Sequence, residues 1–298
     1  MMQSSAKPVY LIDSSIFIFR SYYAVPDEFF DAQGHSINAL YGFARFLTRF
    51  LQQTQADLVA LAFDESLSTS FRNEIYPAYK ANRDPAPESL KIQMRRCREL
   101  AELLGIATYA DDCYEADDLI GSLHHCYKQK GHEITIVSAD KDLAQLLQAG
   151  DNWWDYGKSE PLNGEGVCAK MGVHPHQVCD FLALAGDKVD NIPGVPGIGA
   201  KTAAALLKHF GNLQEILKRS REIEFLSIRG AKSCMNKIRQ FEKEALISQQ
   251  LSRIVTDVPL ENSDIIRRKS TECELLKFIE DMRFGPLLRR QLLEAAGS

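Results

Sequence analysis

Acidic side chains follow strand-like apolar runs or open predicted helices throughout this sequence. Nine stand in such positions: Asp13, Asp64, Glu115, Asp117, Asp118, Asp140, Asp142, Asp187 and Asp190. Like charges that share a cleft repel and raise each other's pKa, so a common site requires a counter-charge. Carboxylate oxygens are suitable ligands for Mg²⁺ or Mn²⁺, and paired ions of this kind serve phosphodiester cleavage. We therefore expect a carboxylate site that binds two or more divalent cations.

The elements that must position these acids alternate along the first two-thirds of the chain. Strands are predicted at residues 9–12, 58–63, 106–109, 134–137 and 152–156. Helices are predicted at residues 38–53, 88–104, 116–130 and 142–147, and later at 200–210, 272–283 and 286–295. Strands that alternate with helices predict a mostly parallel sheet covered by helices.

Three of the acids directly follow predicted strands. Asp13 comes after VYLI, Asp64 after LVALAF, and Asp140 after ITIVSA. In an open parallel sheet, ligands bind beyond the carboxyl ends of the strands. The spacing therefore predicts that these side chains belong to one shared site at that edge.

Glu115, Asp117 and Asp118 stand at the start of the helix predicted at 116–130. Glu115 and Asp118 are three residues apart, so they can share a face, and a helix N-terminus tolerates their charge. Ordinary N-terminal capping accounts for EADD taken alone, and equally for Asp140 or Asp142 alone. It is the complete set of acids that favours metal binding.

A basic segment with interleaved aromatics separates Asp64 from the helix predicted at 88. It contains Arg72, Lys80 and Arg83 beside Phe71, Tyr76 and Tyr79. Aromatic rings that stack bases and cations that pair with phosphates suit single-stranded nucleic acid. The alternative is a solvated, partly helical surface loop, because the prolines of this segment break any long helix.

Glycine-rich turns precede the helix predicted at 200–210. Glycine turns that lead into a helix N-terminus expose backbone N–H groups and form an anion site, here with Lys201 as a counter-charge. The GxxxxGK[ST] spacing of a Walker A loop is absent, because Lys201 follows an alanine. A purely structural helix hairpin is the alternative. The turn residues of this predicted phosphate site are Gly194, Gly197 and Gly199.

Charge is unevenly distributed although the net charge is −5. Residues 66–100 contain seven Lys or Arg against four acids, and residues 192–243 contain ten against four. An acidic pocket between two basic stretches is typical of a nucleic-acid enzyme.

The seven cysteines form no CxxC pair, and we expect them to be reduced, buried thiols. Two short His/Cys groups lack the spacing of structural zinc sites. No signal peptide or membrane span is visible, so we expect a soluble intracellular protein.

Several motifs together resemble the bacterial 5′-nucleases, which include the 5′→3′ exonuclease domain of DNA polymerase I and the flap endonucleases. They are DSSIFIFRSYYA, AFDES, FRNEIYPAYKANR, YEADDLIG, SADKDLAQL and GDKVDNIPGVPGIGAKTA. The resemblance covers nearly the whole chain. It implies an α/β fold with a PIN-like, mostly parallel sheet, a helical arch and a helix–three-turn–helix DNA-binding region. The catalytic domain would comprise residues 1–174, with the arch at about 66–100, and the helical region residues 175–298.

The resemblance also implies roles for individual residues. Lys80 and Arg83 match positions that contact the scissile phosphate, while Arg20 and Arg72 match basic positions near the active site. Residues 194–201 would hold K⁺ through backbone carbonyls while amides bind duplex phosphates. One metal region would use Asp13, Asp64, Glu115, Asp117 and Asp118, and the other Asp140, Asp142, Asp187 and Asp190.

The implied function is Mg²⁺-dependent hydrolysis of DNA at 5′ flaps, nicks or free 5′ ends, in replication and repair including primer removal. We expect a cytoplasmic, nucleoid-associated monomer with no membrane partner, and a stand-alone nuclease rather than part of a polymerase. One alternative is a PIN-like ribonuclease, which would not need the helix–three-turn–helix region. The other is a flap- or junction-binding protein that does not cut. Some stand-alone homologues lack part of the acidic set, whereas this chain has all of it.

Overall fold

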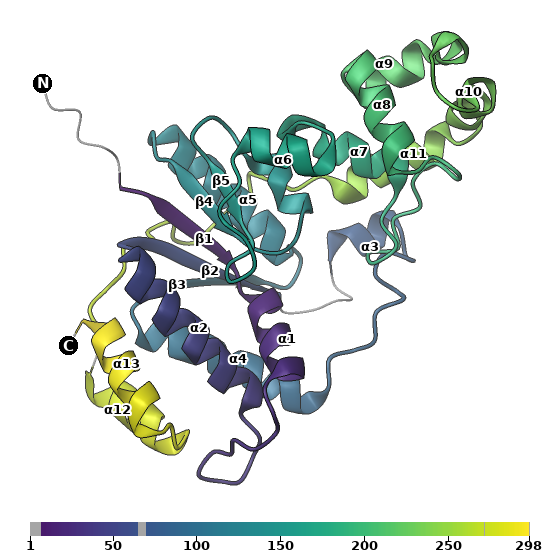
Figure 1. The fold of residues 1–298 in the computed structure, drawn as a ribbon. Coiled ribbons are helices and arrows are strands. Elements are labelled where there is room, and N and C mark those ends of the chain that lie inside the picture. Colours follow the sequence, from purple (N-terminus) through teal and green to yellow (C-terminus); the bar gives the residue numbers. More distant parts are fainter. Residues whose placement is uncertain (1–6, 65–69, 271, 298) are drawn as a thin grey trace, which may run out of the picture. The chain divides into compact units, whose positions relative to one another are not determined.

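The computed structural model describes residues 7–64, 70–270 and 272–297 (Figure 1). The chain forms two compact units. Unit 1 comprises Met1–Glu65, Pro85–Ala139 and Thr256–Ser298, and unit 2 comprises Ser66–Asp84 and Asp140–Val255. These units group residues by contact, and the domain boundary at 174/175 stays a prediction.

Parallel strands form the centre of unit 1. They are β1 (Val9–Asp13), β2 (Leu58–Asp64), β3 (Ala107–Asp111) and β4 (Ile134–Val137), in the order β3-β2-β1-β4. The register pairs Asp13 with Ala62 and Asp64 with Asp111. β1 and β2 are apolar and almost wholly buried, as expected for a parallel sheet covered by helices. The predicted parallel sheet is confirmed, with strand ends shifted by at most two residues.

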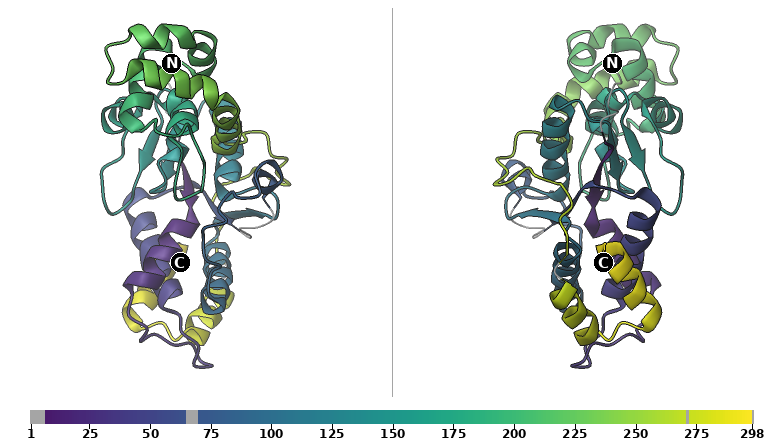
Figure 2. Two further views of the ribbon diagram at one scale, coloured as in Figure 1. Left: turned by 90° about the vertical axis from the view of Figure 1, so that its right-hand side faces the viewer. Right: turned by 90° about the vertical axis from the view of Figure 1, so that its left-hand side faces the viewer.

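The other elements of unit 1 are helices, which pack on the sheet or on one another. They are α1 (Ser14–Ala24), α2 (Asn38–Thr54), α4 (Glu88–Leu103), α5 (Ala116–Gln129), α12 (Glu272–Asp281) and α13 (Pro286–Ala296). α5 contacts β1, β2 and β3. Near the end of the chain, α12 packs on α4 and α13 packs on α2, so the last helices lie beside early ones (Figures 1 and 2).

Helix α1 is not among the helices predicted from the sequence. Its sequence, SSIFIFRSYYA, is rich in aromatic and β-branched residues, which favour strands and obscure a helical period. Phe17 and Ile18 are buried, and α1 packs mainly on α2. Tertiary packing therefore overrides local preference here, and α1 begins immediately after Asp13.

Unit 2 is mainly helical. Its elements are α3 (Phe71–Ile75), η1 (Asp142–Leu146), β5 (Asn152–Trp154), α6 (Gly164–Met171), η2 (Pro175–Gln177), α7 (Val178–Ala185), α8 (Ala200–Phe210), α9 (Leu213–Lys218), η3 (Ser220–Phe225), α10 (Ala231–Gln240) and α11 (Glu242–Ser252). The helix predicted at 142–147 is a single 3₁₀ segment, η1. The helix predicted at 200–210 is confirmed as α8.

The predicted arch, residues 66–100, is divided between the two units. Residues 66–69 lie outside the described residues, and 70–84 belong to unit 2. From Glu88 onward the segment is α4, which buries Leu90, Cys97 and Leu100 in unit 1. The segment that precedes Pro85, with Arg72, Lys80 and Arg83, is therefore separate from the helical remainder of the predicted arch.

The cysteines are all free thiols, but they are not all buried as predicted. Cys113 and Cys273 are exposed, whereas Cys97 and Cys234 are buried. Burial raises the pKa of the Cys97 thiol well above its usual value. No helix among the described residues is long and apolar enough to cross a membrane.

Candidate metal centre and nucleic-acid interface

Asp13 and Asp64 end the neighbouring strands β1 and β2 in unit 1. Asp13 is only 4% exposed, and one of its carboxylate oxygens accepts a hydrogen bond from the Ser138 hydroxyl at 2.8 Å. Ser15 Oγ donates in the same way to Asp64 Oδ2 at 2.8 Å. Each carboxylate is thus oriented by a serine from a different segment, which fixes its direction at the sheet edge.

The start of α5 is attached to the same edge. The backbone N–H of Ala116 donates to Asp64 Oδ1 at 2.9 Å. Asp118 is fully buried and its Oδ2 accepts from the Glu115 backbone N–H at 3.1 Å, which caps the helix. Asp117 lies between them and is half-buried. Unit 1 therefore attaches the acidic start of α5 to the sheet edge at which Asp13 and Asp64 end their strands.

Asp140 and Asp142 are half-buried neighbours in unit 2. The Asp142 backbone N–H donates to Asp140 Oδ1 at 2.9 Å. Burial, followed by the charge of Asp190, raises the pKa of Asp140, while Lys80 and Lys141 oppose the rise. Burial and the charge of Asp140 raise the pKa of Asp142 well above its usual value. Two carboxyl groups that disfavour each other's charge are in the situation that a bound cation would relieve.

Asp187 and Asp190 complete the acidic set of unit 2. Lys141 Nζ donates to Asp187 Oδ2 at 3.0 Å, and the Val189 backbone N–H donates to Asp187 Oδ1 at 2.7 Å. Burial alone would raise the pKa of Asp187, but these hydrogen bonds lower it below its usual value. An antiparallel bridge between Asp187 and Ile192 closes the turn that carries both acids.

Lys80 and Arg83 lie against Asp190 in unit 2. Arg83 Nη2 donates to Asp190 Oδ1, and Lys80 Nζ is 3.9 Å from Asp190 Oδ2. The Lys80 backbone N–H also donates to the Asp190 carbonyl at 3.0 Å. The two cations predicted to meet the scissile phosphate are therefore held beside a predicted metal ligand.

Three other predicted DNA contacts differ in exposure. Arg72 is 2% exposed, and its guanidinium donates to the carbonyls of Leu251 and Arg253 at 2.8 and 2.9 Å. Tyr79 is also buried, in a cluster with Leu251. A direct contact of either side chain with DNA would require it to leave these partners. Arg20 is half-buried on α1, with its guanidinium 5.7 Å from the centre of the Phe17 ring.

The predicted phosphate site leads into α8. Gly194 has φ +59°, and a Cβ at this residue would lie 2.3 Å from the Gly186 backbone nitrogen. Gly197 has φ +77° and lies beside the ammonium of Lys237 on α10. Gly199 precedes α8 directly and has open space around it. Lys201 and Gly199 are exposed, so this turn presents N–H groups and a cation to solvent.

The acids suit a hard divalent cation by their chemistry. The carboxylates supply only oxygen donors. Asp142 Oδ1 is buried and has no hydrogen-bond partner in the part of the chain that the structure describes. Within residues 7–64, 70–270 and 272–297, no three His, Cys, Asp or Glu side chains already stand as a metal's ligand shell. A bound cation would therefore have to bring its carboxylate ligands closer together. Its positive charge would offset the free-energy cost of desolvating Asp142.

Four residues beside these sites escaped the sequence analysis. Ser15 and Ser138 donate hydrogen bonds to Asp64 and Asp13. Their positions near strand ends could have identified them, since Ser15 stands two residues after Asp13 and Ser138 two residues before Asp140. Lys141 pairs with Asp187, and Lys237 lies at the Gly197 turn. No local pattern marks these two lysines, because their partners are distant in the sequence.

Two family models match the chain in succession. Residues 8–172 match the model of the 5′-3′ exonuclease N-terminal resolvase-like domain, and residues 173–272 match the 5′-3′ exonuclease C-terminal SAM fold. The chain belongs to the 5′-3′ exonuclease family. The predicted family, and with it the expectation of a 5′-3′ exonuclease, is therefore confirmed.

Curated relatives agree with this assignment. A 5′-3′ exonuclease of Buchnera aphidicola subsp. Schizaphis graminum is 36% identical over 91% of this chain and 94% of its own length. A 5′-3′ exonuclease of Aquifex aeolicus is 36% identical over 87% of this chain and 85% of its own length. The DNA polymerase I of Rhizobium leguminosarum is 35% identical over 95% of this chain, but the match spans only 28% of that polymerase.

Solved structures share the fold. A T5 5′-exonuclease with bound divalent metal ions (zinc) has a TM-score of 0.69 at 19% identity, over 97% of this chain and 100% of that one. The catalytic core of Rad2 in complex with DNA substrate has a TM-score of 0.66 at 15% identity, over 98% of this chain and 92% of that one. At these identities the likeness concerns the fold alone.

Proposed function

We propose that this exonuclease hydrolyses DNA phosphodiesters at 5′ flaps, nicks and free 5′ ends, with Mg²⁺ or Mn²⁺ as the catalytic cation. The observation that carries the proposal is the hydrogen bond from the Ala116 backbone N–H to Asp64 Oδ1. It holds the acidic start of α5 against the end of β2, so acids from separate segments face one edge. Oxygen-only donors of this kind match a hard divalent cation.

The carboxylates of unit 1 would hold one metal region, and those of unit 2 the other. Divalent cations supply water activation and neutralisation of developing charge in phosphodiester cleavage. Ser15 and Ser138 keep Asp64 and Asp13 oriented for this task. Because a carboxylate must be ionised to bind a cation, the raised pKa of Asp142 makes metal affinity fall as the pH falls.

Lys80 and Arg83 would bind the phosphoryl oxygens of the substrate, where charge builds up during cleavage. Their present partner, Asp190, keeps both cations close to the acids of unit 2. A cation bound to Asp190 would weaken the attraction of this carboxylate for Lys80 and Arg83. Both side chains could then pair with the substrate phosphate.

Duplex DNA would bind at the turn before α8. Gly197, Gly199 and Lys201 offer amides and positive charge to phosphates, and Lys237 adds a second cation. K⁺ would bind the carbonyls of residues 194–201. Contacts to phosphates alone give specificity for the structure of DNA rather than its sequence. We further propose that the protein acts as a cytoplasmic, nucleoid-associated monomer in replication and repair, including primer removal.

The direct test uses a 5′-labelled flap duplex, a nicked duplex, a blunt duplex and a single-stranded RNA, each with Mg²⁺ or with EDTA. Mg²⁺-dependent cutting near the flap junction supports the proposal. Flap binding without cutting under any divalent cation would indicate a junction-binding protein. Cleavage of the RNA alone would indicate a ribonuclease.

A further inference from the structure

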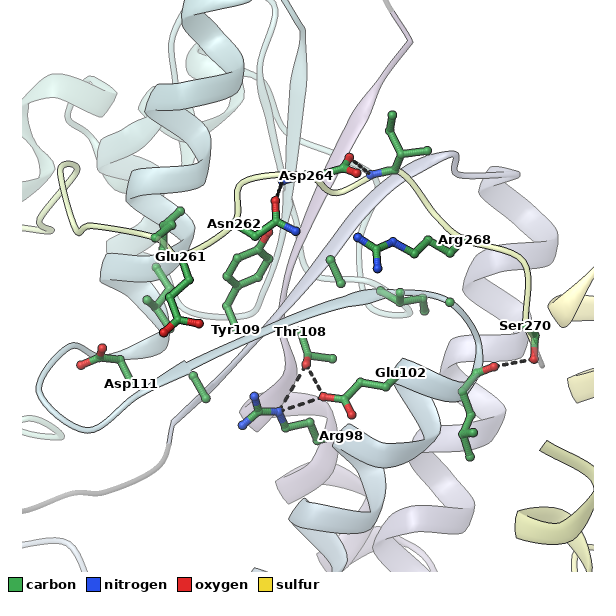
Figure 3. A pocket seen from close by; sticks show the side chains of 18 of the residues that line it. Arg98, Glu102, Thr108, Tyr109, Asp111, Glu261, Asn262, Asp264, Arg268 and Ser270 are labelled. Atoms are coloured by element: carbon green, nitrogen blue, oxygen red, sulfur yellow. Dashed lines mark hydrogen bonds and ion pairs between the residues drawn. The ribbon is translucent and has the colours of Figure 1, made fainter. Parts of the chain in front are cut away.

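A pocket of about 600 Å³ opens in unit 1 along the outer edge of β3 (Figure 3). Its walls come from the end of α4, from β3 and from the segment around residues 258–270. None of the predicted site residues lines it. The exonuclease activity therefore leaves this pocket unexplained.

The floor of the pocket is an open strand edge. β3 is the outermost strand on its side of the sheet and pairs only with β2 among the described strands. Within the described chain, no backbone hydrogen bond from outside the sheet reaches Ala107–Asp111. The strand sequence, ATYAD, has no proline or lysine of the kind that commonly blocks an exposed edge. Its outward N–H and C=O groups can therefore pair with an added strand.

One end of the pocket is cationic. The Arg268 guanidinium points toward the middle of the pocket in Figure 3. Among the described residues its side chain makes no hydrogen bond or ion pair, in contrast to Arg98, which pairs with Glu102. Lys269 lines the same end and is exposed. An unpaired guanidinium in a pocket is a ready partner for a carboxylate.

The other end is acidic. Asp111 and Glu261 lie near each other there, away from Arg268 (Figure 3). β3 has five residues, so its ends are separated by about 13 Å. Between the two ends lie Tyr109, Asn262 and Asp264, which also line the pocket (Figure 3). The pocket is thus an extended site with a cationic end and an anionic end.

We propose that this pocket binds an extended peptide segment of a partner protein by strand addition to β3. The peptide's backbone pairs with the free edge of Ala107–Asp111. Its acidic side chain pairs with Arg268, and a basic side chain at its other end meets Asp111 and Glu261. This site is independent of the nuclease centre, because no acid or cation predicted for cleavage takes part in it.

The experiment measures fluorescence anisotropy of two labelled peptides, Lys-Val-Thr-Val-Thr-Glu and its reverse, with the full chain. The two directions cover parallel and antiparallel addition, since either orientation can place the acid at Arg268. At least one peptide is expected to bind, and Arg268→Glu is expected to weaken it by about tenfold or more. Arg49→Glu is the matched control, because Arg49 is exposed in the same unit outside the pocket. It should leave binding unchanged.

A second measurement separates strand addition from simple charge capture. A peptide of the same charges with alternate amides N-methylated cannot pair with the edge and is expected to lose binding. Hydrogen exchange of the β3 amides should slow when the unmodified peptide binds. Three results would overturn the proposal: no binding of either peptide, equal binding by the N-methylated form, or equal binding by Arg268→Glu. A dimer that breaks on Arg268→Glu, with no peptide binding, would assign the edge to a second copy instead.

Discussion

Arg83 and Asp190 form an ion pair in unit 2, and Lys80 approaches the other oxygen of the same carboxylate at 3.9 Å. The side chains of both cations are at least two-thirds buried, at 33% and 10% exposure, so the pairing is better shielded from solvent than most surface ion pairs. The arrangement holds the two cations that we propose for phosphate binding on an acid of the predicted metal region. A metal cation that bound Asp190 would thus compete with Lys80 and Arg83 for one carboxylate.

Lys80→Ala is expected to lower turnover on a 5′ flap by about 100-fold to 1,000-fold, because a charge-stabilising donor is lost from the transition state. Flap binding should change little, since the turn before α8 supplies separate phosphate contacts. Single-turnover rates and binding isotherms measured together check this, with Lys158→Ala as a control at an exposed lysine of the same unit. A loss confined to binding would mean that Lys80 only recruits DNA.

Ser138→Ala is expected to weaken the apparent Mg²⁺ affinity in cleavage by roughly 10- to 100-fold, because Asp13 loses the hydroxyl that orients it. The variant should recover when Mg²⁺ is raised. Ser21→Ala is a suitable control, because Ser21 Oγ donates only to a helix carbonyl, that of Phe17. An unchanged Mg²⁺ titration in Ser138→Ala would show that this hydroxyl has no part in the metal site.

Gly194→Ala is expected to destabilise the protein by more than about 1 kcal/mol. The added Cβ would lie 2.3 Å from the Gly186 backbone nitrogen, and the residue has φ +59°. Gly199→Ala provides the comparison, since that position has open space and no positive φ. Urea unfolding of both variants measures the difference, and equal stability of the two would contradict this account of the turn.

Asp31 should make the stability of unit 1 dependent on pH. Burial alone would raise its pKa, but hydrogen bonds from His35 and Gln33 lower it below its usual value. A lowered folded-state pKa contributes stability above the unfolded-state pKa of about 3.9, and this contribution is lost as the pH falls through the folded-state pKa. Unfolding free energies of wild type and Asp31→Asn should therefore differ at neutral pH and converge in acid. A constant difference would argue against the lowered pKa.

Much of the fold follows from local sequence. Strand β4 occupies residues 134–137 as predicted, and β1 and β2 end only one residue later than predicted. These strands are predictable because the buried strands of a parallel sheet form distinctive apolar runs. The acids Asp13 and Asp64 were placed correctly at the sheet edge for the same reason. α1 was missed because its apolar content has no clear helical period.

Contacts between distant segments lay beyond prediction. Nothing near Arg72 indicates that its guanidinium caps the end of α11, and nothing near Tyr79 marks it as a core residue beside Leu251. The sequence predicts DNA contacts for both, because basic and aromatic residues follow the same sequence pattern in a DNA-binding segment and in a buried one. Burial, which depends on the whole chain, is what distinguishes the two cases.

Single-turnover cleavage of a 5′-labelled flap duplex across a Mg²⁺ titration is the decisive experiment for metal-dependent cleavage by the predicted metal-binding acids. Wild type is compared with Asp140→Ala and with Glu160→Ala, an exposed acid of the same unit. Wild type and Glu160→Ala are expected to cut only when the cation is present. Asp140→Ala should cut more than about 100-fold more slowly while still binding the flap. Cutting in EDTA, or wild-type cutting by Asp140→Ala, would contradict metal-dependent cleavage by these acids.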